Sequence, residues 1–143
     1  MSEKVNIKAI FWDIGGVIVR THDWSGRIRW EKRLGLQPHE FEHIVFRGEM
    51  GKRASIGQAS ADDVWTWVLN HFGLPESDRL KLQHDFSVGD EVDEELVAYI
   101  RSLRPAYRTG VISNAWPEAR HWLENKWRAA DAFDHIVISA EVG

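Results

Sequence analysis

The sequence contains no cysteine among its 143 residues. This absence excludes disulfide bonds, thiolate metal sites and a cysteine nucleophile, and it permits an intracellular setting. No stretch approaches the roughly 20 apolar residues that a membrane-spanning helix needs. The first residues, MSEKVNIK, also lack the apolar core of a signal peptide. We therefore expect a cytoplasmic protein with no membrane partner.

An excess of basic residues is also missing. The chain has 18 Lys and Arg against 22 Asp and Glu, which gives a formal net charge of -4. A nucleic-acid-binding surface needs a basic stripe, so we expect no nucleic-acid partner. The remaining composition, 43% hydrophobic and 28% charged, is that of a globular chain. The length suits one domain, or a small core that carries an insert.

Three short apolar runs are the main structural signal. They cover residues 7–12, 110–112 and 136–138, and each ends at polar or turn residues. Asp13 follows the first run and Ser113 follows the second. Short β-branched runs of this kind are typical of buried parallel strands. We therefore predict a parallel sheet of three strands.

Helical patterns lie between these runs. Ser60 and Asp63 have the spacing of an N-terminal capping box, and Gly73 stands where a glycine C-cap belongs. Further helices are expected around residues 25–35, 38–45 and 96–103 and after Pro117.

This order of elements predicts an α/β fold with a partial Rossmann-like parallel sheet and an inserted helical-bundle cap. The helices between residues 21 and 87 are too many for one crossover connection. We therefore assign residues 1–20 and 88–143 to a partial core domain and residues 21–87 to the cap domain.

Several charged groups are interpreted as ordinary surface features. The acidic cluster at residues 90–95 is interpreted as charge at a helix N-terminus. Arg27 and Arg47, in the expected cap, are interpreted as exposed charges. His39 and His43 lie four residues apart, but they lack an acidic partner set for a metal.

Chemistry-bearing residues follow the first two predicted strands. Ligands of an open parallel sheet bind beyond the carboxyl ends of its strands. Asp13 and Ser113 are expected at such ends, with Gly15 and Gly16 presenting backbone amides to an anion. A phosphoryl group fits this set: the carboxylate attacks phosphorus, the amides and the hydroxyl hold its oxygens, and a divalent cation offsets the negative charge.

Residues 9–18, with Asp-x-Gly-Gly-Val, resemble the first motif of the haloacid dehalogenase-like (HAD) hydrolase superfamily. Residues 111–115 resemble its second motif, a strand that ends in Ser or Thr. Residues 49–65 are similar to the cap of its helical-cap subfamily, and residues 133–143 to its third strand and the loop after it. The resemblance covers essentially the whole chain.

The resemblance implies a role for each candidate residue. Asp13 would be the catalytic nucleophile that forms an aspartyl-phosphate. Gly15, Gly16, Ser113 and Asn114 would surround the phosphoryl group, and Mg²⁺ would be held by Asp13 and the Gly15 carbonyl. The implied substrate is a small phosphorylated metabolite.

The sequence departs from the family pattern in two ways. Gly15 occupies the position where the family usually has a second Asp as general acid and base, a contribution worth roughly 10²–10⁴-fold. The family's third motif, a Lys, and its fourth, an acidic pair, lie beyond the segment that matches Gly143. We therefore expect a chain truncated before both motifs, with weak metal binding and doubtful activity on its own. The first strand would then have an open edge, which favours a homodimer or strand exchange.

Three functions stay open. The first is a magnesium-dependent phosphatase, which Gly-Gly-Val after Asp13 favours. The second is a 2-haloacid dehalogenase, although dehalogenases of this superfamily more often place an aromatic-Gly-Thr sequence after the Asp. The third is a non-catalytic module that acts in binding or dimerisation. A dinucleotide-binding domain is disfavoured because the G-x-G-x-x-G pattern is missing.

Overall fold

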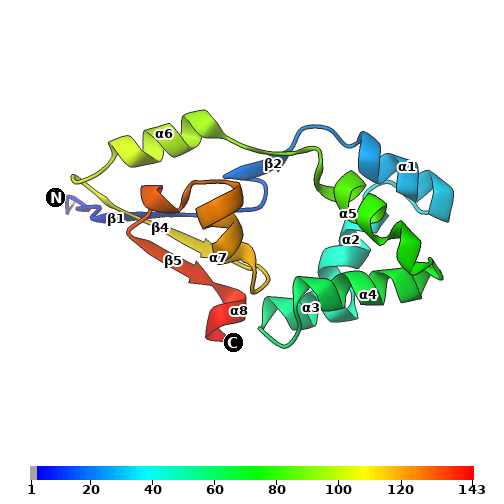
Figure 1. Cartoon of the computed structure of the whole chain (residues 1–143). Helices are drawn as coiled ribbons and strands as arrows, with labels where there is room; N and C mark the ends of the chain where they lie inside the picture. The colour runs from blue at the N-terminus through cyan, green and yellow to red at the C-terminus, as the bar shows by residue number, and fades with distance from the viewer. Residues whose placement is uncertain (1–2) are drawn as a thin grey trace.

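The structure is a computed structural model that describes residues 3–143. The molecule is elongated, with a small parallel sheet and its helices towards one end and a group of helices at the other (Figure 1). Two extended segments connect these parts. The N-terminus leaves the sheet end, and the C-terminus lies between the two parts.

The parallel sheet consists of the three predicted strands. They are β1 (Ala9–Trp12), β4 (Arg108–Ser113) and β5 (His135–Ile138), in the order β1-β4-β5. Both pairs are parallel, as the crossover pattern predicts. With the surrounding helices, this sheet confirms the predicted α/β fold.

Among residues 3–143, helices cover one face of the sheet and leave the other bare. Helix α6 (Glu94–Ser102), the short α7 (Ala119–His121) and the π-helical turn after it, Trp122–Lys126, pack on the covered face, and α8 (Ser139–Val142) ends the chain. The hydrophobic core on this side includes Ile18, Val97, Ile100, Val111 and Leu123. On the other face Phe11, Ile112 and Val137 are exposed. The strand alternation therefore separates a packed face from a bare one.

A second, two-stranded sheet was not predicted. Strand β2 (Val19–Thr21) pairs antiparallel with β3 (Asp90–Val92), where the chain leaves the parallel sheet and returns to it. Each strand has three residues, and acidic residues are poor strand formers. The interpretation of the 90–95 cluster as helix N-terminal charge is confirmed for Asp93, Glu94 and Glu95, and was wrong for Asp90 and Glu91, which belong to β3. Asp93 caps α6 by accepting a hydrogen bond from the Leu96 amide at 3.0 Å.

Five helices form the second part of the molecule, which we call the helical group. They are α1 (Ser25–Leu34), α2 (Glu40–Arg47), α3 (Glu49–Ser55), α4 (Ala61–Phe72) and α5 (Arg79–Ser87). The capping box of Ser60 and Asp63 and the left-handed Gly73 are present at the two ends of α4, as predicted.

The helical group has its own hydrophobic core. This core includes Trp30, Phe41, Val64, Val68 and Leu82, and it also takes in Trp116 from the segment after β4. The division of the chain into two domains stays a prediction, and the separate clusters of buried residues support it.

Arg27 is buried, contrary to the expectation of an exposed charge. Its side chain is 3% exposed, and its Nε donates to the Phe86 carbonyl at 2.8 Å. Its Nη2 donates to Asp90 Oδ1 at 3.0 Å, and its Nη1 lies 3.4 Å from Glu42 Oε2. One guanidinium therefore connects α1 with α2, α5 and β3, and these partners make its burial tolerable.

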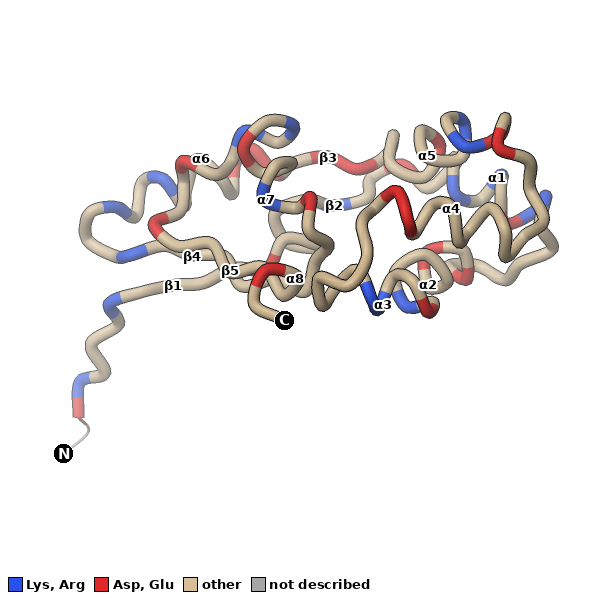
Figure 2. Tube along the Cα trace, turned by 60° about the horizontal axis from the view of Figure 1, so that its bottom comes forward, with Lys and Arg blue, Asp and Glu red and all other residues tan. Residues whose placement is uncertain are grey.

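Positively and negatively charged residues are interspersed along the molecule. Lys and Arg are scattered among Asp and Glu, and no single basic stripe is visible (Figure 2). Within the described residues, no helix is both long and apolar enough to cross a membrane.

Candidate active site

The candidate site lies where β1 and β4 end. Because the two strands are parallel and pair Trp12 with Val111, their carboxyl ends meet at the same edge of the sheet. Asp13 is the next residue after β1, and Ser113 is the last residue of β4. The Ser113 hydroxyl donates a hydrogen bond to Asp13 Oδ1 at 2.8 Å. The structure thus brings together two side chains that are 100 residues apart in the sequence.

The Asp13 carboxylate has one engaged oxygen and one free oxygen. Oδ1 accepts the Ser113 hydroxyl and also the Ile14 amide, at 2.7 Å. Within residues 3–143, Oδ2 makes no hydrogen bond and the carboxylate forms no ion pair, and the residue is exposed. Ser113 itself is buried, with 6% of its surface exposed. The arrangement holds the carboxylate in place and leaves Oδ2 available to a ligand.

A tight loop follows Asp13. The Ile14 carbonyl accepts hydrogen bonds from the Ile18 amide at 2.9 Å and from the Val19 amide at 3.0 Å. Gly16 has a φ of 76°, in the left-handed region that favours glycine, and its amide donates to the Val19 carbonyl at 2.8 Å. The loop therefore returns the chain directly into β2.

The predicted phosphate-binding residues differ in whether their polar groups already have a hydrogen-bond partner. Within the described chain the Gly15 amide makes no backbone hydrogen bond and the Asn114 side chain makes none. Both residues are exposed at the same edge of the sheet. The Gly16 amide is already used inside the loop, so two adjacent free amides are not available there. The phosphate-binding roles of Gly15, Gly16, Ser113 and Asn114 stay predictions.

The residues present do not make a complete magnesium site. Across residues 3–143, no three His, Cys, Asp or Glu side chains come together in a way that could hold a metal ion. The expected ligands are the Asp13 carboxylate and the Gly15 carbonyl, whereas Mg²⁺ demands a near-octahedral set of oxygens. Asp13 Oδ1 is also already engaged by Ser113 and Ile14.

The sequence patterns did not predict the part of the helical group that reaches this edge. Phe46 of α2 packs against Trp116, with ring centroids 5.3 Å apart, and Trp116 follows Asn114 by two residues. Trp116 is buried although it belongs to a loop. No periodicity connects positions 46 and 116, so only the structure shows that they meet.

The sequence matches no known family model and no curated protein. Solved structures do resemble the fold. A predicted HAD-like family hydrolase from Porphyromonas gingivalis is 23% identical, with a TM-score of 0.66, over 95% of this chain and 68% of that chain. A HAD family enzyme from Bacteroides thetaiotaomicron, solved with magnesium and inorganic phosphate, is 19% identical, with a TM-score of 0.70, over 95% of this chain and 70% of that chain.

A third structure is the L-2-haloacid dehalogenase from Xanthobacter autotrophicus with chloropropionic acid covalently bound. It is 20% identical, with a TM-score of 0.54, over 93% of this chain and 57% of that chain. At these identities the likeness establishes the fold alone. This chain has the fold of the HAD-like hydrolases.

Proposed function

We propose that the chain provides the nucleophile of a HAD-like hydrolase that acts on a small phosphorylated metabolite, with Asp13 as the attacking group. The observation that carries the proposal is the hydrogen bonding of the two oxygens of the Asp13 carboxylate. Oδ1 is held by Ser113 and Ile14, and Oδ2 is free at an exposed sheet edge. An oriented carboxylate with a free oxygen is what covalent catalysis by Asp requires.

The proposed reaction has two steps. Asp13 Oδ2 attacks phosphorus, the bond between phosphorus and the ester oxygen breaks, and the leaving alkoxide takes a proton from water. Water then attacks the aspartyl-phosphate, which releases inorganic phosphate and restores the carboxylate. In this proposal the Gly15 amide and the Asn114 side chain, which are both exposed, bind phosphoryl oxygens, and Gly15 itself offers no acid to the leaving group.

Magnesium is the cofactor proposed for the phosphatase reaction. The Bacteroides thetaiotaomicron enzyme was solved with magnesium and inorganic phosphate, so a protein with this fold can bind both. The donor set described above is too small for the ion. We therefore expect added Mg²⁺ to bind this chain weakly.

Dehalogenation is the second candidate, and the same free oxygen favours it. A carboxylate can displace halide from carbon without a metal, and it then carries the acid as an ester that water cleaves. The Xanthobacter autotrophicus dehalogenase shares the fold. The Gly-Gly-Val sequence after Asp13 is the feature that places the phosphatase first.

Product release separates these candidates. The purified chain is incubated with p-nitrophenyl phosphate, with and without Mg²⁺, and separately with 2-chloropropionate, and free phosphate and chloride are measured. In parallel, an acid-quenched sample is digested and the peptide that contains Asp13 is weighed by mass spectrometry. Phosphate release together with a phosphoryl adduct on that peptide supports the first proposal, and chloride release supports the second.

Asp13→Asn should abolish both signals. Glu91→Gln is the matched control, because Glu91 is an exposed carboxylate on β3 that makes no side-chain hydrogen bond within the described chain. Full turnover by Asp13→Asn would remove Asp13 from the proposed role. If the unaltered chain releases neither phosphate nor chloride, a non-catalytic binding or dimerising module becomes the better assignment.

A further inference from the structure

A pocket lies between α3 and α4 in the helical group, and we call it the α3–α4 pocket. It has a volume of about 350 Å³, within the range of roughly 300–1,000 Å³ that is typical of small-molecule sites. Met50 and Arg53 line it from α3, about one turn apart, and Asp63, Trp67 and Asn70 line it from one stripe of α4. None of these residues follows a strand of the parallel sheet, so the pocket is separate from the candidate active site.

Trp67 forms a rigid apolar wall of the α3–α4 pocket. Its ring stacks on His71, with centroids 4.9 Å apart and planes inclined by 16°. The edge of the ring rests against Gly48, where an added Cβ would lie only 2.7 Å from Trp67 Cη2. These two neighbours hold the indole in one orientation. The half-buried indole and the Met50 thioether, which also lines the pocket, both favour contact with an aromatic ring.

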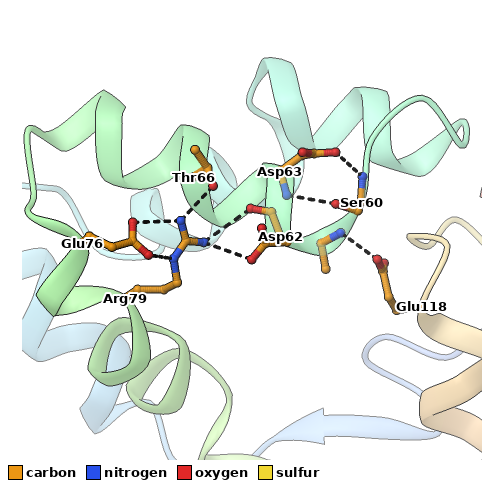
Figure 3. Close-up of polar contacts among 8 residues, drawn as sticks. Ser60, Asp62, Asp63, Thr66, Glu76, Arg79 and Glu118 are labelled. Atoms are coloured by element: carbon orange, nitrogen blue, oxygen red, sulfur yellow. Dashed lines mark hydrogen bonds and ion pairs between the residues drawn. The ribbon is translucent and has the colours of Figure 1, made fainter.

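Hydrogen bonds fix the α4 side of the pocket (Figure 3). Asp63 belongs to the capping box of α4, and Glu118, from the segment after β4, accepts a hydrogen bond from the Ala61 amide at 2.9 Å. About one turn further on, Arg79 Nη2 donates to the hydroxyl oxygen of Thr66, another lining residue, at 2.8 Å. The pocket is therefore largely preformed, which lowers the entropic cost of binding a ligand.

Two opposite charges line the α3–α4 pocket without forming an ion pair. Within residues 3–143, the Arg53 side chain makes no hydrogen bond or ion pair, and Asp63 uses only Oδ2, which accepts from the Ser60 amide at 2.8 Å. Hydrogen bonds from Ser60 lower the pKa of Asp63 from its ordinary value of 3.8, and the charge of Arg53 lowers it further. A free guanidinium and a free carboxylate oxygen therefore lie near each other, beside a fixed indole.

We propose that the α3–α4 pocket binds a small zwitterion, an α-amino acid with an aromatic side chain. Arg53 binds the carboxylate of the ligand by charge-assisted hydrogen bonds, and Asp63 Oδ1 accepts from its ammonium group. The aromatic side chain packs on Trp67 and Met50. A ligand with a single charge satisfies only one of the two charged groups, so the pocket favours a molecule that carries both. The inference does not depend on which reaction Asp13 performs.

Nuclear magnetic resonance titrations of the isotope-labelled chain test this site, with L-phenylalanine as the probe. L-Phenylalanine should shift the backbone amide signals of Arg53, Asp63 and Trp67, and the shifts should saturate with a Kd below about 1 mM. Hydrocinnamate lacks the ammonium group and phenethylamine lacks the carboxylate, so each should bind at least about tenfold more weakly. The proposal is overturned by the absence of saturable shifts, by equal affinities of the three compounds, or by shifts confined to Gly15 and Asn114 at the sheet edge.

Arg53→Gln and Asp63→Asn test the two charges separately. Each should weaken the binding of L-phenylalanine at least about tenfold, whereas phenethylamine should lose no affinity in Arg53→Gln because it has no carboxylate. A merely structural effect would weaken both compounds alike. Lys52→Gln is the matched control, because Lys52 is an exposed cation on the same helix that does not line the pocket.

If Asp63→Asn fails to fold, because Asp63 also caps α4, the comparison of Arg53→Gln with Lys52→Gln decides. Equal affinities for L-phenylalanine in these two variants would contradict the proposed site.

Discussion

The Ser113 hydroxyl, on the neighbouring strand, donates a hydrogen bond that orients the Asp13 carboxylate. We predict that Ser113→Ala lowers hydrolysis of p-nitrophenyl phosphate by roughly 10²-fold, the loss expected when a reacting group is misplaced by about 1 Å. Steady-state kinetics measure the effect. Ser113→Thr keeps the hydroxyl and should retain most of the rate, and equal losses in the two variants would contradict an orienting role for the hydroxyl.

Asp85 is a buried carboxylate whose charge is compensated. Burial alone raises the pKa of Asp85, but hydrogen bonds from Lys81 and Trp30 and the charges of Lys81 and Arg29 outweigh this effect, so the pKa is lowered from its ordinary value of 3.8. A lowered pKa in the folded state stabilises the fold above the unfolded value, and this stability is lost as the pH falls through the folded value.

We therefore predict an acid-dependent loss of stability that Asp85→Asn reduces. The free energy of unfolding of the unaltered chain should fall more steeply below pH 3.8 than that of Asp85→Asn. Urea titrations at several pH values measure both curves. Parallel curves below that pH would show that Asp85 does not contribute to the acid dependence.

At the scale of secondary-structure elements, Arg27 joins α1 to α5 and β3. Its removal would leave Asp90 without its cation and the Phe86 carbonyl without its donor. We predict that Arg27→Met destabilises the fold by about 3 kcal/mol, the lower part of the range for breaking a buried pair, since Asp90 is 23% exposed.

Arg33→Met, on the same helix, is the control for Arg27→Met. Arg33 is 53% exposed in its pair with Asp78, so its loss should cost at most about 1 kcal/mol. Urea unfolding followed by far-UV circular dichroism compares the two variants. Similar losses would contradict a special contribution from the buried guanidinium.

At the scale of the whole molecule, the bare face of the parallel sheet presents apolar side chains to other molecules. Phe11, Ile112 and Val137 are 46%, 55% and 38% exposed, and β1 forms an edge of the sheet. An apolar face beside an open strand edge favours pairing with a second chain.

We predict that the chain self-associates through this face. Sedimentation velocity should show concentration-dependent dimers or larger species, and Ile112→Lys should shift them towards the monomer. Leu80→Lys is the control, because Leu80 is 78% exposed on α5, away from the sheet. A monomer at all concentrations, or equal effects of the two variants, would count against this interface.

Local signals in the sequence determined the strands of the parallel sheet, the caps of α4 and the positions of Asp13 and Ser113. The β-branched runs were enough to predict β1, β4 and β5, because short continuous apolar runs are typical of the strands of parallel sheets. The expectation that these strands are buried was wrong for one face of the sheet, where Phe11, Ile112 and Val137 are exposed. The caps of α4 could be predicted from Ser60, Asp63 and Gly73, because capping uses neighbours in the chain. The placement of Asp13 and Ser113 at strand ends followed from the same runs.

Only the tertiary structure decided the burial of Arg27, the pairing of β2 with β3, and the contact between Glu118 and Ala61. Each of these joins residues more than 50 positions apart, and each depends on partners that no local period or cap specifies. A short polar segment becomes a strand, and an arginine becomes buried, only when distant groups satisfy its hydrogen bonds. The free Asp13 Oδ2 was decided in the same way, because which oxygen Ser113 engages depends on how β1 and β4 pair.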